Sequence, residues 1–543
     1  MDVDGCCTSA ISRVPYRDIA GFSRLFADYA ASSPEAARFY SSGFDTEALL
    51  RTAEKSVQGR HADRTELVEI LRDQQALWGH DAAAWASIEK LANPDAAVIV
   101  TGQQVGLLGG PLYTVLKAMT TVLLARHLET VSGRPFVPVF WLGSEDHDFA
   151  EMASAWVPDR ALSVSPPREG NVGPVGAIRF SGEIEHVVND LEDALPPTDF
   201  RDAVIEGVRS CYREGETFRD AFARLLRLLL PETGLVIFAQ DDDRVKRLAA
   251  PLWRRELEDW SSSDAALRSA TEEIAHTYHA QVHIRPTNLF VLHEGQRLPL
   301  DAEDGRFRLR GADRSWSPSE ALALLDAEPE RFSPNVVMRP LTQDWLFPSA
   351  AYVGGPGETA YFGQYRGVYD WAELVMPVIF PRVSLTFIEP GVRRTLDKLG
   401  RPVAAFSKDA DKLFAEIARE RMELDVEARF GRTIGEINQL MGPLAGDVAG
   451  IDPSMKKAVD ATRAALNKEV IRLRDRVLKA DRRNRDQLRQ QVEKVAHALF
   501  PEGKPQERVV SALYFTTKYG PDFFVRLMED LDTDTSAHLL VDL

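Results

Sequence analysis

The chain has 543 residues, 44% of them apolar and 27% charged, and a formal net charge of −17. This length predicts two to four domains with a full hydrophobic core, and the composition excludes a wholly disordered protein. The acidic balance argues against a general nucleic-acid binder, because neutralising phosphates requires clustered lysine and arginine.

The three cysteines, Cys6, Cys7 and Cys211, can form neither a disulfide framework nor a closed structural zinc site. The N-terminus does not resemble a signal peptide, and no apolar segment has the length of a membrane span. We therefore expect a cytoplasmic protein that binds neither nucleic acid nor membrane.

Residues 1–92 are predicted to form helices that pack on the next domain, because apolar residues recur there at helical spacing. Residues 96–100 and 136–142 are apolar runs typical of buried strands, and a helix is expected between them over 113–129. Strand, loop, helix and strand make a βαβ unit, so the two strands should be parallel neighbours. We predict an α/β core with a parallel sheet over residues 93–390, with inserts over about 156–335.

The remaining elements are predicted as follows: short strands and turns over 156–191, helices over 200–230, a buried strand over 234–240 followed by a helix towards 260, a β-hairpin over 283–300, core strands over 335–341 and 350–354, and one strand within 378–387. From 391 to 500 apolar residues recur at spacings of three and four, with a turn signal at 442–453. This pattern predicts an antiparallel coiled-coil hairpin. Residues 501–543 are expected to return to the core as helices.

A glycine-rich loop joins the first predicted strand to its helix. Such a loop offers backbone N–H groups at a helix N-terminus, which suits phosphate or carboxylate. A purely structural turn is the alternative. The candidate binding residues are Thr101, Gly102, Gln103, Gln104, Gly110, Tyr113, Thr114 and Lys117.

Four ionisable residues, Glu145, Asp146, His147 and Asp148, directly follow the second strand. Crowding them is costly unless they bind something, so they are candidates for a general base, an ammonium site or metal ligands. In an extended segment Glu145 and His147 would point one way and the other two the opposite way. A solvated helix cap is the alternative.

Two later segments add candidate binding residues. Glycines beside a glutamate and near an arginine indicate close approach of the backbone to a ligand, or else a structural bend. This set comprises Arg339, Gln343, Asp344, Gly355, Glu358, Gln364 and Arg382. Lys504 and Arg508 flank a polar turn before the last helices and are candidates for contact with a nucleotide phosphate.

The motifs TGQQ, GGPLYT, VFWLGSEDHD, MRPLTQDWLFPSAAYVGGPGE and FPEGKPQERV occur in this order along nearly the whole chain. Together they resemble the bacillithiol synthase family, the cysteine ligases of bacillithiol biosynthesis. The resemblance implies a Rossmann-like core, a C-terminal coiled coil that makes a homodimer, and ligation of L-cysteine to glucosaminyl-malate.

Amide formation from a free carboxylate is uphill, so the carboxyl group must be activated. Our hypothesis is activation by ATP through an acyl-adenylate, with ADP as a related ligand. No metal is expected. In this hypothesis the loop Gln103 to Pro111 and the side chain of Lys117 bind phosphate or the malyl carboxylates. Asp146 or Glu145 holds the cysteine ammonium, and His147 or Asp148 accepts the amine proton.

Two other functions stay open at the level of sequence. The first is a metal-dependent hydrolase or transferase that uses Glu145 to Asp148 as ligands. The second is a non-catalytic coiled-coil scaffold. The ligase hypothesis depends on one geometric condition: the loop from Thr101 and the cluster from Glu145 must face a shared cavity at one edge of the sheet.

Overall fold

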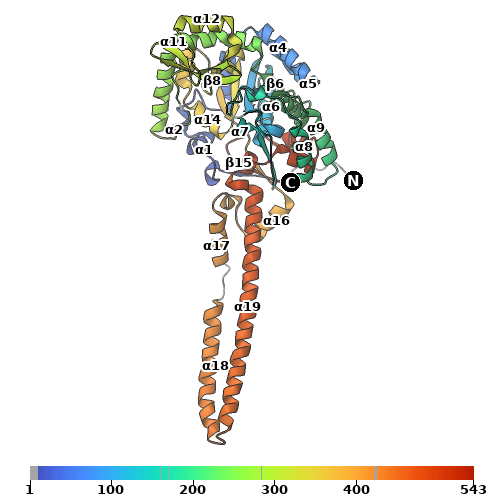
Figure 1. Cartoon of the computed structure of the whole chain (residues 1–543), viewed down its shortest axis with the longest axis vertical. Helices are drawn as coiled ribbons and strands as arrows, with labels where there is room; N and C mark the ends of the chain where they lie inside the picture. The colour runs from blue at the N-terminus through green and yellow to red at the C-terminus, as the bar shows by residue number, and fades with distance from the viewer. Residues whose placement is uncertain (1–9, 159, 169, 283, 421–424) are drawn as a thin grey trace. The chain divides into compact units, whose positions relative to one another are not determined.

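The computed structural model describes residues 10–158, 160–168, 170–282, 284–420 and 425–543 (Figure 1). The chain divides into a core unit, Met1–Ile388 with Lys504–Leu543, and a hairpin unit, Glu389–Gly503. Cys6, Cys7 and His283 lie outside the described residues.

A five-stranded parallel sheet with the order β13-β12-β2-β3-β6 forms the centre of the core unit. Its strands are β2 (Ala97–Gln104), β3 (Phe136–Gly143), β6 (Val236–Ala239), β12 (Ser349–Gly354) and β13 (Val378–Pro381). Helix α6 (Tyr113–Ser132) connects β2 to its parallel neighbour β3. The predicted βαβ unit and parallel α/β core are therefore confirmed.

The central strands are apolar along their length because both faces of the sheet are covered. In β3, Val137, Val139 and Trp141 enter one hydrophobic cluster, whereas Phe140 and Leu142 enter another. Successive side chains of a strand point to opposite faces, so a strand without polar alternation is buried on both.

Helices precede the sheet, as the periodicity predicts. They are α1 (Arg24–Ala30), α2 (Pro34–Ala37), α3 (Thr46–Gln58), α4 (Arg64–Leu77) and α5 (Ala82–Leu91). The carboxylates of Asp45, Asp63 and Asp81 accept amide hydrogen bonds at the starts of α3, α4 and α5. These caps satisfy N–H groups that have no partner within the helix.

The segment after β3 departs from the prediction of short strands and turns over 156–191. A hairpin of β4 (Ser154–Val157) and β5 (Arg160–Ser163) is present, but α8 (Glu183–Ala194) is a helix. Its buried residues Ile184, Val187, Val188 and Leu191 have helical spacing, which the prediction overlooked. Helices α9 (Arg201–Cys211), α10 (Phe218–Leu229) and α11 (Asp243–Ala275) follow.

A second, antiparallel sheet has the order β10-β9-β8-β7-β11. Its strands are β7 (Leu289–His293), β8 (Gln296–Glu303), β9 (Arg306–Leu309), β10 (Ser315–Trp316) and β11 (Phe332–Pro334). Strands β7 and β8 confirm the predicted hairpin. Helix α12 (Pro318–Ala327) lies between β10 and β11 in sequence.

The predicted core strand over 335–341 is wrong, because helix α13 (Met338–Leu346) occupies this segment. Asn335 Oδ1 accepts hydrogen bonds from the N–H groups of Val337 and Met338. This side-chain cap allows β-branched neighbours to lead into a helix. Helices α14 (Pro356–Phe362) and α15 (Arg366–Ala372) follow β12.

Residues 378–387 contain parts of two strands rather than one. Strand β13 belongs to the central sheet, whereas β14 (Leu385–Ile388) joins a third sheet with the order β1-β15-β14. Strands β1 (Ala10–Val14) and β15 (His538–Asp542) bring the two ends of the described chain together. Helices α20 (Ala512–Tyr519) and α21 (Phe523–Asp530) precede β15.

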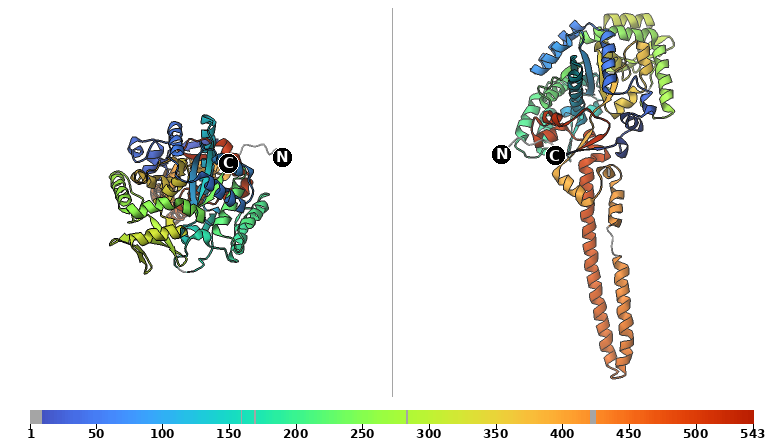
Figure 2. Two further views of the ribbon diagram at one scale, coloured as in Figure 1. Left: turned by 90° about the horizontal axis from the view of Figure 1, so that it is seen from above. Right: turned by 180° about the vertical axis from the view of Figure 1, so that it is seen from behind.

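The hairpin unit contains α16 (Pro390–Leu399), α17 (Ala410–Glu420), α18 (Val426–Ala449) and α19 (Met455–Leu499). The antiparallel helices α18 and α19 lie side by side in Figure 1 and in the right-hand view of Figure 2, which confirms the predicted hairpin. The turn starts later than predicted, because α18 continues through Pro443 to Ala449. No helix in the described part of the chain is long and apolar enough to cross a membrane.

A buried ion pair ties the C-terminal segment to the core sheets. Glu507 is fully buried and accepts hydrogen bonds from Arg382 Nη1 (2.8 Å) and Nη2 (2.6 Å), Ser384 Oγ (2.8 Å) and Leu385 N (2.9 Å). Burial alone would raise the pKa of Glu507, but the charge and hydrogen bonds of Arg382, together with smaller effects of His538 and Ser384, lower this pKa.

Glu507→Gln should therefore destabilise the core unit by about 3 kcal/mol, because it leaves the buried Arg382 charge without its partner. Thermal unfolding of the purified chain measures the loss as a lower Tm. Glu529→Gln, at an exposed position of α21, is the matched control and should unfold like the original chain. Equal melting of all three proteins would contradict the assignment.

Candidate active site

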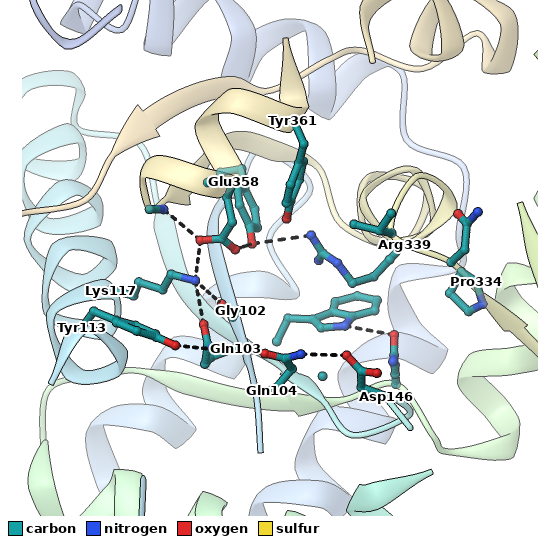
Figure 3. A pocket seen from close by; sticks show the side chains of 18 of the residues that line it. Gly102, Gln103, Gln104, Tyr113, Lys117, Asp146, Pro334, Arg339, Glu358 and Tyr361 are labelled. Carbon is teal, nitrogen blue, oxygen red and sulfur yellow. Dashed lines mark hydrogen bonds and ion pairs between the residues drawn. The ribbon is translucent and has the colours of Figure 1, made fainter. Parts of the chain in front are cut away.

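A cavity of about 540 Å³ opens at the carboxyl ends of β2, β3 and β12 (Figure 3). In the sheet order, β3 and β6 follow β2 on one side, whereas β12 and β13 lie on its other side. The cavity is therefore at the switch point between β2 and β12, the usual ligand site of open α/β sheets. Gln103, Asp146 and His147 share this cavity. The predicted meeting of the first loop with the cluster after β3 is therefore present.

The ammonium of Lys117 connects three parts of the cavity wall. It donates to Gly102 O (2.9 Å) and Gln103 Oε1 (2.9 Å), and it forms an ion pair with Glu358 (Figure 3). Glu358 also accepts from Tyr352 Oη (2.5 Å) and Gly355 N (2.8 Å). Lys117 therefore fixes the ends of β2 and β12 rather than presenting a free charge.

Burial lowers the pKa of Lys117, and the carboxylate of Glu358 opposes this shift. For Glu358 burial alone would raise the pKa, but the ammonium of Lys117, together with the hydrogen bonds from Tyr352 and Gly355, lowers it. Lys117 and Glu358 form an ion pair, so together they contribute almost no net charge to the cavity.

The glycine-rich loop does not expose its amides to the cavity, contrary to the prediction. Leu107, Leu108 and Leu112 anchor it in the hydrophobic core. Gly110, with φ of 68°, donates its N–H to Leu107 O (3.0 Å), and Leu112 N donates to Val510 O (2.8 Å). The anion cradle expected there is therefore occupied by contacts within the protein.

Two threonines of this motif also lie away from the cavity lining. Thr101 Oγ1 donates to Val353 O (2.8 Å) and so joins β2 to β12. The buried hydroxyl of Thr114 has no hydrogen-bond partner among the described residues. Gly102, Gln103, Gln104 and Tyr113 do line the cavity, and a Cβ at Gly102 would lie 2.9 Å from Trp141 O. Only glycine allows this close approach.

The four residues after β3 point in different directions. Asp146 and His147 line the cavity, Glu145 forms a buried ion pair with Lys246, and Asp148 Oδ1 caps α7 (Phe149–Met152) by accepting from Glu151 N. The predicted alternation is wrong because residues 144–145 form a turn rather than an extended strand. The four side chains thus provide no common metal-ligand set.

Asp146 is held as an anion. Its Oδ2 accepts from Gln104 Nε2 (2.8 Å), and its Oδ1 accepts from His147 N (2.7 Å) and Asp148 N (3.2 Å). Burial alone would raise the pKa of Asp146, but the hydrogen bond from Gln104, the charge of Arg297 and these amides lower it.

Arg297 is a cavity residue that sequence reasoning missed. Its Nη1 lies 3.1 Å from His147 Nδ1, its Nε donates to Ser333 Oγ (2.9 Å) and its Nη2 donates to Pro334 O (2.6 Å). The guanidinium also stacks on Phe290, 3.9 Å from the ring centroid. Its place on the antiparallel sheet, far from the motifs in sequence, gave no local signal.

The residues predicted from the segment after 335 separate into two groups. Arg339, Gly355, Glu358 and Arg382 line the cavity. Gln343, Asp344 and Gln364 do not; Gln343 Oε1 accepts from Arg339 Nη1 (3.2 Å), and Gln364 Oε1 accepts from Gln281 N (2.8 Å). Burial raises the pKa of Asp344 to about 6, and its carboxylate accepts from Gln343 and Tyr369.

Two buried guanidinium nitrogens of the lining have no hydrogen-bond partner among the described residues: Arg382 Nε and Arg285 Nη1. Arg508 also lines the cavity, whereas Lys504 does not. Of the described residues, six with cationic side chains line the cavity, against the carboxylates of Asp146 and Glu358; the cations are Lys117, Arg285, Arg297, Arg339, Arg382 and Arg508. This excess suits an anionic ligand.

Among the described residues, no group of three or more His, Cys, Asp or Glu side chains is arranged to hold a metal ion. Fold and site together define a Rossmann-like α/β protein with a cationic cavity at the carboxyl edge of its sheet, in a chain that also forms a helical hairpin.

Family models agree with this description. Residues 10–383 match "Bacillithiol biosynthesis BshC, N-terminal Rossmann-like domain", and residues 385–543 match the C-terminal coiled-coil domain of the same family. The chain belongs to the BshC family of bacillithiol biosynthesis.

Curated relatives carry the name "Putative cysteine ligase BshC". The protein of Salinibacter ruber is 44% identical, with 98% of each chain covered, and that of Chlorobaculum tepidum is 35% identical, with 96% of this chain and 97% of the relative covered. A solved structure titled "putative arginyl t-RNA synthetase", from Campylobacter jejuni, aligns at 11% identity over 83% of this chain and 98% of its own, with a TM-score of only 0.21.

A buried carboxyl group supports the cavity wall from behind. Glu256 accepts from Asn288 N (2.8 Å), Asn288 Nδ2 (3.0 Å) and Ser263 Oγ (2.7 Å). Asn335, which lines the cavity, donates its Nδ2 to Asn288 Oδ1 (3.0 Å). Burial raises the pKa of Glu256 to about 7 from its ordinary 4.5.

Because the folded chain holds a proton on Glu256 that the unfolded chain loses, its stability should fall as pH rises from about 4.5 to 7. This shift corresponds to about 3 kcal/mol. Glu256→Gln keeps the neutral shape and should remove this part of the pH dependence. Melting curves at pH 5 and 7.5 measure it, with the exposed Glu258→Gln on the same helix as control. Parallel pH slopes for Glu256→Gln and the original chain would contradict this.

Proposed function

We propose that the protein is the ligase that joins the carboxyl group of L-cysteine to the amine of glucosaminyl-malate, giving bacillithiol, and that it acts in the cytoplasm. The observation that carries this proposal is the cationic cavity: six cations and two carboxylates face it in a chain whose net charge is −17. Glucosaminyl-malate brings two carboxylates, which such a lining favours. The name of the relatives, "Putative cysteine ligase BshC", agrees with cysteine as one of the two substrates.

The binding roles follow from which groups have free hydrogen-bonding capacity. Arg382 Nε and Arg285 Nη1 are cationic donors without a hydrogen-bond partner in the described part of the chain, so they suit carboxylate or phosphate oxygens. Asp146 is the carboxylate of the lining that Lys117 does not pair, so we assign it to the ammonium of cysteine. Gln104 keeps this carboxylate ionised and in place.

Condensation requires an activated carboxyl group, and we propose that ATP supplies the activation. The amine nitrogen then bonds to the carboxyl carbon and releases its proton to water, while one carboxyl oxygen leaves bonded to phosphorus. The unpartnered guanidinium nitrogens and the exposed Arg508 fit a polyphosphate by charge. The protein's part is to hold the reacting groups together and to neutralise the phosphates.

The purified full-length chain, supplied with L-cysteine, glucosaminyl-malate and Mg²⁺-ATP, should form the amide and consume one nucleotide per product. Mass spectrometry measures the product, and a phosphate or pyrophosphate assay measures the nucleotide. Unchanged ligation in the absence of every nucleotide would reject the ATP route. Failure to ligate with any nucleotide would reject the ligase itself.

Arg339→Met provides a site-specific arm of this experiment. Losing one charged hydrogen-bond donor from the cavity wall should raise KM for glucosaminyl-malate about tenfold or more. Arg366→Met, at an exposed position of α15, is the matched control and should leave KM unchanged.

We also propose that the hairpin unit makes a homodimer. Seven of the twelve large apolar side chains that are exposed in the described chain lie in this unit: Leu440, Leu444, Ile451, Met455, Leu466, Ile471 and Leu473. This concentration of exposed apolar side chains on a helical hairpin favours association with a second copy.

The full chain should therefore have twice the 60.5 kDa mass in solution. Leu440→Glu combined with Leu473→Glu should weaken dimerisation at least about tenfold, because each charge would be desolvated in the interface. Sedimentation velocity over a concentration series measures this. Leu77→Glu, exposed on α4, should leave the dimer intact. A monomeric original chain, or a dimer untouched by the double change, would reject the assignment.

A further inference from the structure

The ring of His147 contacts two side chains of the antiparallel sheet. Its Nδ1 lies 3.1 Å from Arg297 Nη1, which comes from β8, and its ring centroid lies 5.6 Å from that of Phe290 on β7. Arg297 itself stacks on the same phenyl ring. The imidazole is thus oriented by the antiparallel sheet and not only by the loop that carries it.

The contact with Arg297 fixes which ring nitrogen carries the proton. A guanidinium has only donor N–H groups, so Nδ1 must be the acceptor in this hydrogen bond. A neutral imidazole has one N–H, which then lies on Nε2. Protonating Nδ1 as well would direct two N–H groups at one another over 3.1 Å.

Arg297 cannot easily turn away from His147, because its other nitrogens are engaged. Nε donates to Ser333 Oγ and Nη2 donates to Pro334 O, and the side chain is 7% exposed. Ser333 Oγ in turn donates to Glu145 Oε2 (3.1 Å), and Glu145 pairs with Lys246. Glu145 therefore acts on the cavity indirectly, as a positioning residue for Ser333 and Arg297.

The other charged groups around the ring do not reverse this arrangement. Asp146 Oδ1 lies 3.7 Å from His147 Nδ1, too far for a hydrogen bond, and is occupied by two backbone amides. Asp148 caps α7. Arg285, whose guanidinium lies 5.8 Å from the Phe290 ring centroid, adds a second positive charge that lowers the pKa of His147. Burial, and then the charge of Arg297, lower the pKa of His147, and Asp146 and Asp148 only partly oppose them.

We infer that His147 is a neutral imidazole with its proton held on Nε2 by Arg297, and that it serves the cavity as a hydrogen-bond donor rather than as a base. Its Nε2 has no hydrogen-bond partner among the described residues, and the side chain lines the cavity. Such a donor suits an oxygen that is or becomes negative, such as that of a carboxyl group under attack. This role rests on the proposed ligase function, whereas the protonation state does not.

The protonation state of His147 can be measured in the absence of substrate. Nitrogen-15 NMR of the histidine-labelled full-length chain should show the neutral Nε2–H pattern for His147 between about pH 6 and 8, assigned by its loss in His147→Gln. An Nδ1–H pattern, or a charged imidazolium at pH 7, would overturn the inference even if ligation proceeds as proposed.

Arg297→Met tests whether Arg297 causes this protonation state of His147. Without a donor at Nδ1, His147 should return to a mixture of both neutral forms and titrate nearer the ordinary histidine range. Arg310→Met removes an exposed arginine next to the same sheet, paired with Asp301, and should leave the His147 signals unchanged. The unaltered chain keeps the inference testable if Arg297→Met does not fold.

The donor role is tested by the ligation rate. A glutamine side chain places an amide N–H near the position of the histidine Nε2–H but cannot act as a base. His147→Gln should therefore retain at least tenfold more kcat than His147→Ala, with both variants compared at saturating substrate. Equal loss in the two variants would overturn the donor role, whatever form the NMR signals show.

Discussion

The cavity depends on one buried ammonium. Lys117 is 3% exposed, and it joins Gly102 and Gln103 at the end of β2 to Glu358, which follows β12. Removing an ammonium from water costs several kcal/mol, which is offset only when an anion and further acceptors meet it at close range. The two strand ends therefore have to stay together, and their spacing defines the cavity that opens beside them.

This constraint also separates the cations that shape the cavity from those that can bind a ligand. Lys117 is saturated, and most donors of Arg297 are used within the protein. Arg382 gives both terminal nitrogens to Glu507 and keeps only Nε. The capacity for an anion therefore resides in single unpartnered nitrogens held in fixed positions, and such preorganised donors need little rearrangement on binding.

Periodicity predicted most of the fold, because the strands of the central sheet are apolar on both faces and the helices around them are amphipathic. It failed where a side chain decided the local structure, as at Asn335, whose cap starts α13 after two valines. The site was predicted as far as residue type and strand position allow. The directions in which these groups point were not predictable. The turn at 144–145 places Glu145 in the core, and the leucines of the β2–α6 loop orient the backbone amides of that loop towards the protein interior.

Contacts between residues that lie far apart in the sequence could not be predicted from it. Arg297 and Glu507 lie more than a hundred residues from the side chains they bind, His147 and Arg382, and only the assembled sheets bring them together. Arg297 and Glu507 nevertheless determine which hydrogen bonds the motif residues His147 and Arg382 can offer to a ligand. In a chain of net charge −17 the long-range field repels anions, so a bis-carboxylate must be recognised by these short-range contacts inside the cavity, where low dielectric strengthens them. Selectivity for such a ligand then rests on how exactly the buried partners hold each donor, more than on the number of cations present.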